Sequence, residues 1–224
     1  MVVEIITTSK SINNAGGKHV SNEVEVEIKK PISEVYKWVV YTPLEIQLQG
    51  TAIIPGVSST KLMNDKKLGE IGHRRLVCLN DGNTAVEEHT FVEDINEHVS
   101  KRYFSYKVWN YTLKIAQNIE YGRGEWWFTP EGDLTHIRWR YSFKLNKLKI
   151  LGRIGVLGRA LFQIFFLKTR YNDFMAETFP FLFQTPSSHI KIQQDGIGRS
   201  RSISKQQWNL TIYTSIGRIM ERGT

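Results

Sequence analysis

Two cationic side chains, His73 and Arg75, alternate with apolar residues in a strand-like segment in the first half of the chain. Residues two positions apart lie on one face of a strand, so both share a face with Ile71, Val77 and Leu79. An arginine on an apolar face can bind an anionic or carbonyl oxygen, and a histidine can exchange protons near neutral pH. The alternative is that this end of the strand is solvated, as charged side chains mostly are. We predict His73 and Arg75 as candidate catalytic residues.

A carboxylate and a phenol are further candidates. Residues 85–93 alternate in two phases, one with Glu88 and the other with Glu87 and His89, and periodicity does not choose between them. A carboxylate on an apolar wall is harder to ionise and can serve as a general acid or base, whereas on a convex face it is simply solvated. Tyr106 shares a face with Phe104, where a buried phenol can donate a hydrogen bond to a carbonyl or enolate oxygen, or can serve for packing alone.

Four residues are expected to contact a ligand from later strand-like runs. Gln117 and Tyr121 continue the phase of the apolar residues between positions 113 and 119. Trp139 and Tyr141 occupy the apolar face of the run over residues 135–143, where they form interior wall or core, with stacking on a substrate as the other interpretation.

Two glycines, at positions 122 and 124, interrupt the phase that leads to Tyr121. Strand glycines often mark bulges, and a slip of one residue turns every later side chain to the opposite face. The facing of Arg123 and Glu125 therefore stays open. If they face outward, they form an ordinary surface pair, and Trp126 and Phe128 point inward instead.

The elements that position these residues follow a simple order. A strand over residues 23–29 alternates apolar and charged side chains, and two short helices, Ile32–Val40 and Leu44–Leu48, follow it, each preceded by a proline. From about Ser58 to Phe143 the pattern predicts six further strands, because apolar runs are separated by Asn-, Asp-, Gly- and Pro-rich turns. The short connections suit antiparallel pairing.

A long helix completes the pattern. Apolar residues recur at spacings of three and four from Ala160 to Phe181, and glycines at positions 152, 155 and 158 should weaken or break the start of this helix. Charges and glycines interrupt its apolar stretch, so it is not expected to cross a membrane. The predicted fold is α+β: a curved, seven-stranded antiparallel sheet around a long C-terminal helix, with two short helices after the first strand.

Four segments, together with the order of the elements, carry a resemblance to known proteins. They are Val24–Val35 (VEVEIKKPISEV), Gly69–Gly82 (GEIGHRRLVCLNDG), Glu88–Asp94 and Thr135–Phe143 (THIRWRYSF). Over roughly residues 20–184 the chain resembles the START-like (SRPBCC) superfamily, and within it the polyketide cyclase/dehydrase-type branch. The resemblance implies a helix-grip fold whose sheet and final helix enclose a cavity for a lipid, sterol, polyketide or similar apolar molecule. It favours Glu88 as the inward carboxylate, and it implies that Ile164 and Tyr171 of the final helix contact the ligand.

Two functions fit this resemblance, since a fold does not fix an activity. One is an enzyme that promotes cyclisation or dehydration of a polyketide-like substrate, in which Arg75, Glu88 and Tyr106 orient and polarise the substrate and His73 shuttles protons. The other is a carrier that only binds a lipid or sterol. We expect no cofactor and no metal, because nucleotide-binding and hydrolase motifs are missing and the histidines lack the spacing of metal ligands.

Charge and cysteine content set the remaining expectations. Residues 1–184 hold 24 basic and 20 acidic side chains and residues 185–224 hold 6 and 2, so half of the net charge of +8 lies in the last 40 residues. We expect a flexible segment over 1–19, a ligand-cavity domain over 20–184, and a basic polar tail over 185–224. The tail is too thinly basic for specific nucleic-acid binding and suits at most weak contact with a membrane surface. The single cysteine, Cys78, fits a cytoplasmic monomer or homodimer without disulfides.

Overall fold

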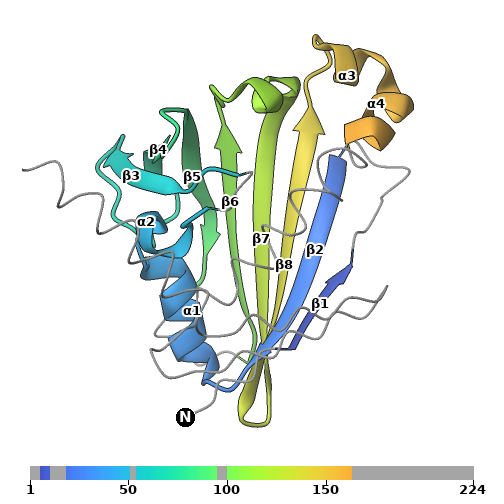
Figure 1. Cartoon of the computed structure of the whole chain (residues 1–224). Coiled ribbons are helices and arrows are strands. Elements are labelled where there is room, and N and C mark those ends of the chain that lie inside the picture. Colours follow the sequence, from blue (N-terminus) through green and yellow to red (C-terminus); the bar gives the residue numbers. More distant parts are fainter. Residues whose placement is uncertain (1–5, 11–18, 51–53, 95–99, 163–224) are drawn as a thin grey trace, which may run out of the picture. The chain divides into compact units, whose positions relative to one another are not determined.

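The structure is a computed structural model, and it describes residues 6–10, 19–50, 54–94 and 100–162 (Figure 1). Its described residues form one antiparallel sheet with the strand order β1-β2-β8-β7-β6-β5-β4-β3. The strands are β1 (Ile6–Lys10), β2 (His19–Ile28), β3 (Val57–Leu62), β4 (Arg74–Leu79), β5 (Thr84–Val92), β6 (Arg102–Trp109), β7 (Ile119–Glu131) and β8 (Leu134–Leu145). The seven predicted strands are β2 to β8, and the six strands after the helices pair antiparallel with their neighbours in sequence, as expected.

The first strand, β1, lies within residues 1–19, the segment that the sequence predicts to be flexible. Ile6–Lys10 pairs antiparallel with β2, from Ile6 opposite Glu27 to Lys10 opposite Glu23. Without β1, the outer edge of β2 would present unpaired backbone groups, which an additional strand satisfies. This is why a stretch with a weak side-chain pattern still forms a strand.

Two helices follow β2, as predicted. They are α1 (Ile32–Tyr41) and α2 (Leu44–Gln47), and Pro31 and Pro43 stand immediately before them. Helix α1 buries Tyr36, whose ring meets Phe128 of β7 edge to face at 5.4 Å and whose hydroxyl donates to the Glu93 carbonyl oxygen at 3.1 Å. Helix α1 is thereby fixed against the central strands β6, β7 and β8.

The inward face of the central strands carries the core. Along β7 and β8, buried aromatic and apolar residues alternate with more exposed polar residues. Trp126 of β7 and Trp139 of β8 are cross-strand partners and stack with ring centroids 4.6 Å apart. Such cross-strand aromatic pairs hold the register of a sheet.

The end of the described chain is a pair of short helices, α3 (Ile150–Arg153) and α4 (Gly155–Phe162). Gly155 separates them with a φ of 56°, a left-handed conformation that glycine adopts without strain. The prediction that the glycines break the start of the long helix is therefore confirmed, and Phe162 packs on Phe143 of β8 at 5.5 Å. The rest of the predicted helix, with Ile164 and Tyr171, and the tail over 185–224 lie outside the described residues. Among the described helices, none is both long and apolar enough to cross a bilayer.

Candidate ligand cavity

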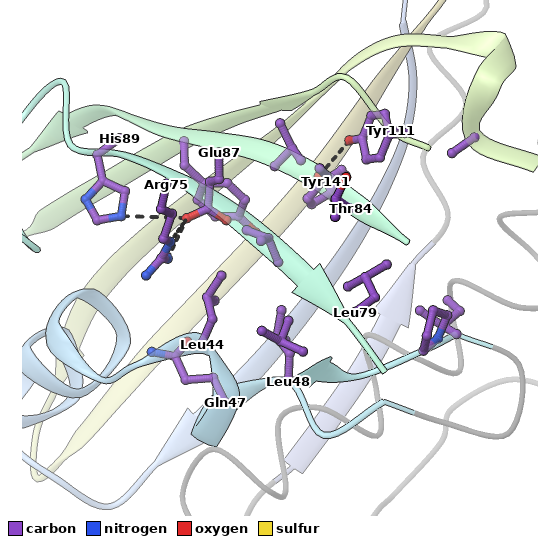
Figure 2. Close-up of a pocket in the computed structure, with 18 of the residues that line it drawn as sticks. Leu44, Gln47, Leu48, Arg75, Leu79, Thr84, Glu87, His89, Tyr111 and Tyr141 are labelled. Atoms are coloured by element: carbon purple, nitrogen blue, oxygen red, sulfur yellow. Dashed lines mark hydrogen bonds and ion pairs between the residues drawn. The ribbon is translucent and has the colours of Figure 1, made fainter. Parts of the chain in front are cut away.

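A cavity of about 200 Å³ lies between the two helices and the inward face of the sheet (Figure 2). Helices α1 and α2 contribute Val39 and Leu44, β4 contributes Val77, and β6 to β8 contribute mainly aromatic rings. The 3₁₀ helix η1 (Lys114–Asn118) and the loop before it close one end with Ala116 and Leu113. The predominance of apolar side chains with a few polar groups is typical of a small-molecule site.

The strongest charges on the cavity wall neutralise one another. Arg75 of β4 and Glu87 of β5 are cross-strand partners, and the Arg75 Nε and Nη2 both donate to Glu87 Oε1, the former at 3.0 Å. The pair faces the cavity (Figure 2), and its side chains are only 8% and 7% exposed. A buried pair of this kind presents no net charge to a ligand, and each partner depends on the other to stay buried.

Beside this pair lies His89 of β5, which is 1% exposed and lines the cavity. Its ring lies 5.0 Å from those of His73 and Phe104, and its Nε2 is 3.8 Å from Glu87 Oε1, which is beyond hydrogen-bond distance. Within the described part of the chain, neither ring nitrogen has a hydrogen-bond partner. Burial, followed by the electrostatic effects of Arg75 and then of His73, lowers the pKa of His89 to about 3, so the His89 imidazole is neutral at physiological pH.

Tyrosines form the next part of the polar lining. Tyr106 of β6 lies beside the indole groups of Trp126 and Trp139, and burial raises the pKa of its phenol, which therefore stays protonated. Tyr111 and Tyr141 bring their hydroxyl oxygens to within 3.4 Å of each other, and burial also raises the pKa of Tyr111. The cavity thus offers neutral donors and acceptors among aromatic rings.

The two glycines of β7 make room for these tyrosines. A Cβ atom at Gly124 would lie 2.2 Å from the Tyr106 ring, and one at Gly122 would lie 2.6 Å from the ring of Tyr141 and from the hydroxyl of Tyr111. Both glycines are on the inward phase of β7, with Trp126 next in line. A ring laid over a strand glycine is a recognised way to fill the missing side chain.

Four predicted site residues lie on the cavity wall: Arg75, Tyr106, Trp139 and Tyr141. His73 is buried, as expected for its phase, but it lies behind the wall, where its Nδ1 is 2.9 Å from the Lys66 carbonyl oxygen. These positions leave the predicted catalytic roles as predictions.

The choice of Glu88 is wrong in its facing. Glu88 lies on the opposite side of β5 from the cavity, where it forms an ion pair with Arg74, and Glu87 is the carboxylate on the cavity wall. The reason is the pairing of β4 with β5, which places Arg75 opposite Glu87 and Arg74 opposite Glu88. Because cross-strand partners face the same side of a sheet, Glu87 must face the cavity if Arg75 does.

Gln117 and Tyr121 were also placed wrongly. Gln117 is exposed on η1, because the run expected to be a continuous strand begins as a 3₁₀ helix. The pairing of β7 with β8 shifts between Ile119 and Tyr121, and this irregularity turns Tyr121 to the outer face, where His19 Nε2 is 2.9 Å from its hydroxyl.

The same irregularity determines which way Arg123 and Glu125 face, which the sequence left open. Trp126 and Phe128 are the inward pair, and Arg123 and Glu125 form a surface ion pair at 3.0 Å.

Five polar residues of the wall were not among the predicted site residues: Gln47, Thr84, Glu87, His89 and Tyr111. Gln47 is committed to structure, since its Nε2 donates to the carbonyl oxygens of Thr42 at 2.8 Å and Val39 at 3.0 Å and so joins α2 to α1. In the described ranges no three His, Cys, Asp or Glu side chains are grouped closely enough to hold a metal ion.

No family model matches the chain, and no curated protein matches it in sequence. Many solved structures resemble it distantly, among them the following three. Ara h 8.0201 is 16% identical, with 73% of this chain and 98% of that chain covered and a TM-score of 0.48. A hypothetical protein from Helicobacter pylori is 16% identical, with 73% and 84% covered and a TM-score of 0.48. Norcoclaurine synthase from Thalictrum flavum is 15% identical, with 65% and 86% covered and a TM-score of 0.43.

These likenesses are too distant to carry information on function. The order of elements in the described chain, a strand, two short helices and six antiparallel strands that close on the first, is that of the START-like helix-grip fold. The predicted α+β class, with its antiparallel sheet and two short helices, is therefore confirmed with an eighth strand added, and the long C-terminal helix lies mostly outside the described residues. The assignment to the polyketide cyclase/dehydrase-type branch stays a prediction.

Proposed function

We propose that this protein binds a neutral, mostly apolar small molecule, polyketide-like or lipid-like, in the cavity between the helices and the sheet. The observation that carries the proposal is the composition of the wall. Apolar and aromatic side chains dominate it, and its polar groups are either paired with each other or held neutral. Burial of apolar surface then supplies most of the affinity, at about 25 cal/mol per Å².

The neutrality of the ligand follows from the polar groups. Arg75 already has its carboxylate, and a ligand carboxylate would have to lose its hydration while it competes with Glu87 for the same guanidinium. His89 has no hydrogen-bond partner for either ring nitrogen in the described residues, so it can donate to one ligand oxygen or accept from one hydroxyl. A hydroxyl or carbonyl group suits this site better than an ionised acid.

Blocking the cavity should abolish binding. Ala85 lines it and is small, so Ala85→Trp would place an indole inside a space of about 200 Å³. We expect the affinity for the neutral dye Nile red, measured by fluorescence titration, to fall roughly 100-fold or more, which corresponds to about 2.7 kcal/mol. Leu62→Trp, at an exposed position of β3, is the matched control and should bind as the wild type does.

Competition with Nile red separates cavity binding from its predicted selectivity. Decan-1-ol should displace the dye at lower concentration than decanoate does. If Ala85→Trp binds the dye like the wild type, the cavity is not the site. If the alcohol and the acid compete equally, the cavity binds ligands but the argument for a neutral ligand fails.

The second candidate function is promotion of cyclisation or dehydration of the bound molecule by positioning and acid–base assistance. It is favoured by one observation: Arg75, Glu87, His89 and Tyr106 face the same cavity. Held in near-attack geometry, a flexible chain can gain roughly 7 to 11 kcal/mol at best from positioning. In this role Tyr106 would donate a hydrogen bond to a developing enolate oxygen, and Glu87 would have the acid–base role predicted for Glu88.

If the protein is such an enzyme, Tyr106→Phe should lower kcat for a linear poly-β-ketone by roughly 10- to 1000-fold, with a smaller change in KM, since the hydrogen bond strengthens as charge develops. Product formation followed by chromatography measures this. Tyr103→Phe, on the outer face of β6, is the control that should keep full activity. Product patterns identical with and without wild-type protein would leave binding as the function.

A further inference from the structure

An unusual group of exposed apolar side chains lies at the end of the described chain. Leu148, Ile150, Ile154, Val156 and Leu157 are each between 42% and 82% exposed, although all five lie within ten consecutive positions. We call this group the apolar tip. Single exposed apolar residues are ordinary, but a contiguous group of this kind marks an interaction surface.

The apolar tip is held in place by a second set of residues that do face the core. Phe162 is buried against Phe143, Leu151 packs against the main hydrophobic core, and Gly158 is buried. Gly152 fits closely under the preceding turn, where a Cβ atom would lie 1.9 Å from the Asn146 carbonyl oxygen. The segment therefore already has an inward apolar side, and the tip is an additional, outward one.

In the sequence, basic residues lie between and beside the members of the apolar tip, and acidic residues are missing from this segment. Lys147, Lys149 and Arg153 are exposed between or beside its members, and Arg159 follows on α4. No acidic residue occurs in the sequence between Asp133 and Asp173. Apolar side chains at the centre of a basic, acid-free segment are the composition that interfacial membrane-binding segments use, with the apolar groups at the acyl boundary and the cations on anionic headgroups.

We propose that the apolar tip docks this protein on the surface of a membrane that contains anionic lipid. The charge favours an anionic bilayer over a protein partner with an apolar groove, because an uncharged groove would gain nothing from the exposed Lys147, Lys149 and Arg153 beside the tip. The position is also suitable for ligand exchange. Helix α3 contacts η1, and η1 together with the loop before it lines one end of the cavity through Ala116 and Leu113. Docking would bring that end of the cavity close to the bilayer.

Vesicle flotation with the full chain tests the proposal. Wild-type protein should float with phosphatidylcholine vesicles that contain about a quarter phosphatidylserine, bind pure phosphatidylcholine at least about tenfold more weakly, and lose binding as salt rises from about 0.1 M to about 0.5 M. The double variant Val156→Glu/Leu157→Glu should lower the apparent affinity at least about tenfold, because it removes apolar groups and adds like charge to the anionic surface.

Two full-length variants serve as matched controls. Leu62→Glu/Met63→Glu changes an equally exposed apolar pair at the far end of β3 and should float like the wild type. Arg199→Gln/Arg201→Gln tests the basic tail in the same way. Circular dichroism melting and Nile red binding confirm that each variant is folded.

The proposal is wrong if the variant in the apolar tip floats normally, or if only the tail variant loses binding. It is also wrong if analytical ultracentrifugation shows a wild-type dimer that Val156→Glu/Leu157→Glu separates, because the tip would then be a contact between two copies. None of these outcomes concerns the cavity, so the proposed ligand binding is tested independently of the docking proposal.

Discussion

Replacing Glu87 by leucine is expected to lower the free energy of unfolding by roughly 3 to 5 kcal/mol, because the Arg75 guanidinium is then buried without its partner. Both side chains are less than a tenth exposed, and both guanidinium hydrogen bonds end on Glu87 Oε1. Arg75→Met should lower the free energy of unfolding by a similar amount, because the Glu87 carboxylate is then buried without its partner. The double variant Arg75→Met/Glu87→Leu should recover most of the loss, since it removes both charges from the apolar wall.

The outer face of the same two strands supplies the control. Arg74 and Glu88 form the neighbouring cross-strand ion pair with the same residue types, but their side chains are 46% and 25% exposed. Arg74→Met, Glu88→Leu and their combination should give a coupling energy of only about 0 to 1 kcal/mol. Urea unfolding of all six variants measures both cycles. Equal coupling in the two cycles would show that the Arg75–Glu87 pair is as well solvated as the outer one.

The same hairpin shows what could be predicted from the sequence. Uninterrupted alternation was enough to place Arg75, Tyr106, Trp139 and Tyr141 on the inward side. It failed for residues 85–93, because both phases of that strand contain apolar and charged residues. The turn at Asn80-Asp81-Gly82 would have indicated which phase faces inward. In a tight antiparallel hairpin the turn fixes the register, so inward Arg75 implies an inward residue directly across, which is Glu87.

The start of β7 could not be predicted in this way. Local patterns do not reveal that the chain forms η1 before the strand, nor that the pairing shifts between Ile119 and Tyr121. The glycines at 122 and 124 were a signal of irregularity, but their function depends on long-range contacts. They leave space for Tyr106, Tyr111 and Tyr141, which come from three other parts of the chain.

Strand β1 shows a different limit of the sequence. Its position depends on the free edge of β2, which is a property of the assembled sheet and not of the Ile6–Lys10 segment. The exposure of the apolar tip is likewise a property of the assembled fold. The break at Gly155 divides this segment into α3 and α4, and five of its apolar side chains are left exposed.

Acidification should destabilise this protein through His89. The pKa of the buried imidazole is lowered to about 3 in the folded state, against an ordinary value of 6.5 when the chain is unfolded. Above pH 6.5 the residue is neutral in both states, so it does not change the free energy of unfolding. As the pH falls below 6.5, His89 becomes protonated in the unfolded chain, whereas in the folded chain it stays neutral down to about pH 3. The resulting loss in the free energy of unfolding reaches roughly 4 to 5 kcal/mol, since each pKa unit of difference corresponds to about 1.36 kcal/mol.

The variant His89→Asn isolates this contribution, because it keeps a polar side chain that does not titrate. Other groups also titrate in this range, but they are common to both proteins and cancel in the difference. Between about pH 8 and about pH 4.5, urea unfolding should show the wild type losing roughly 3 kcal/mol more than the variant. Parallel losses would mean that His89 keeps an ordinary pKa in the folded protein. Water must then reach the wall beside Arg75 and Glu87, and a charged ligand group could be accommodated there as well as a neutral one.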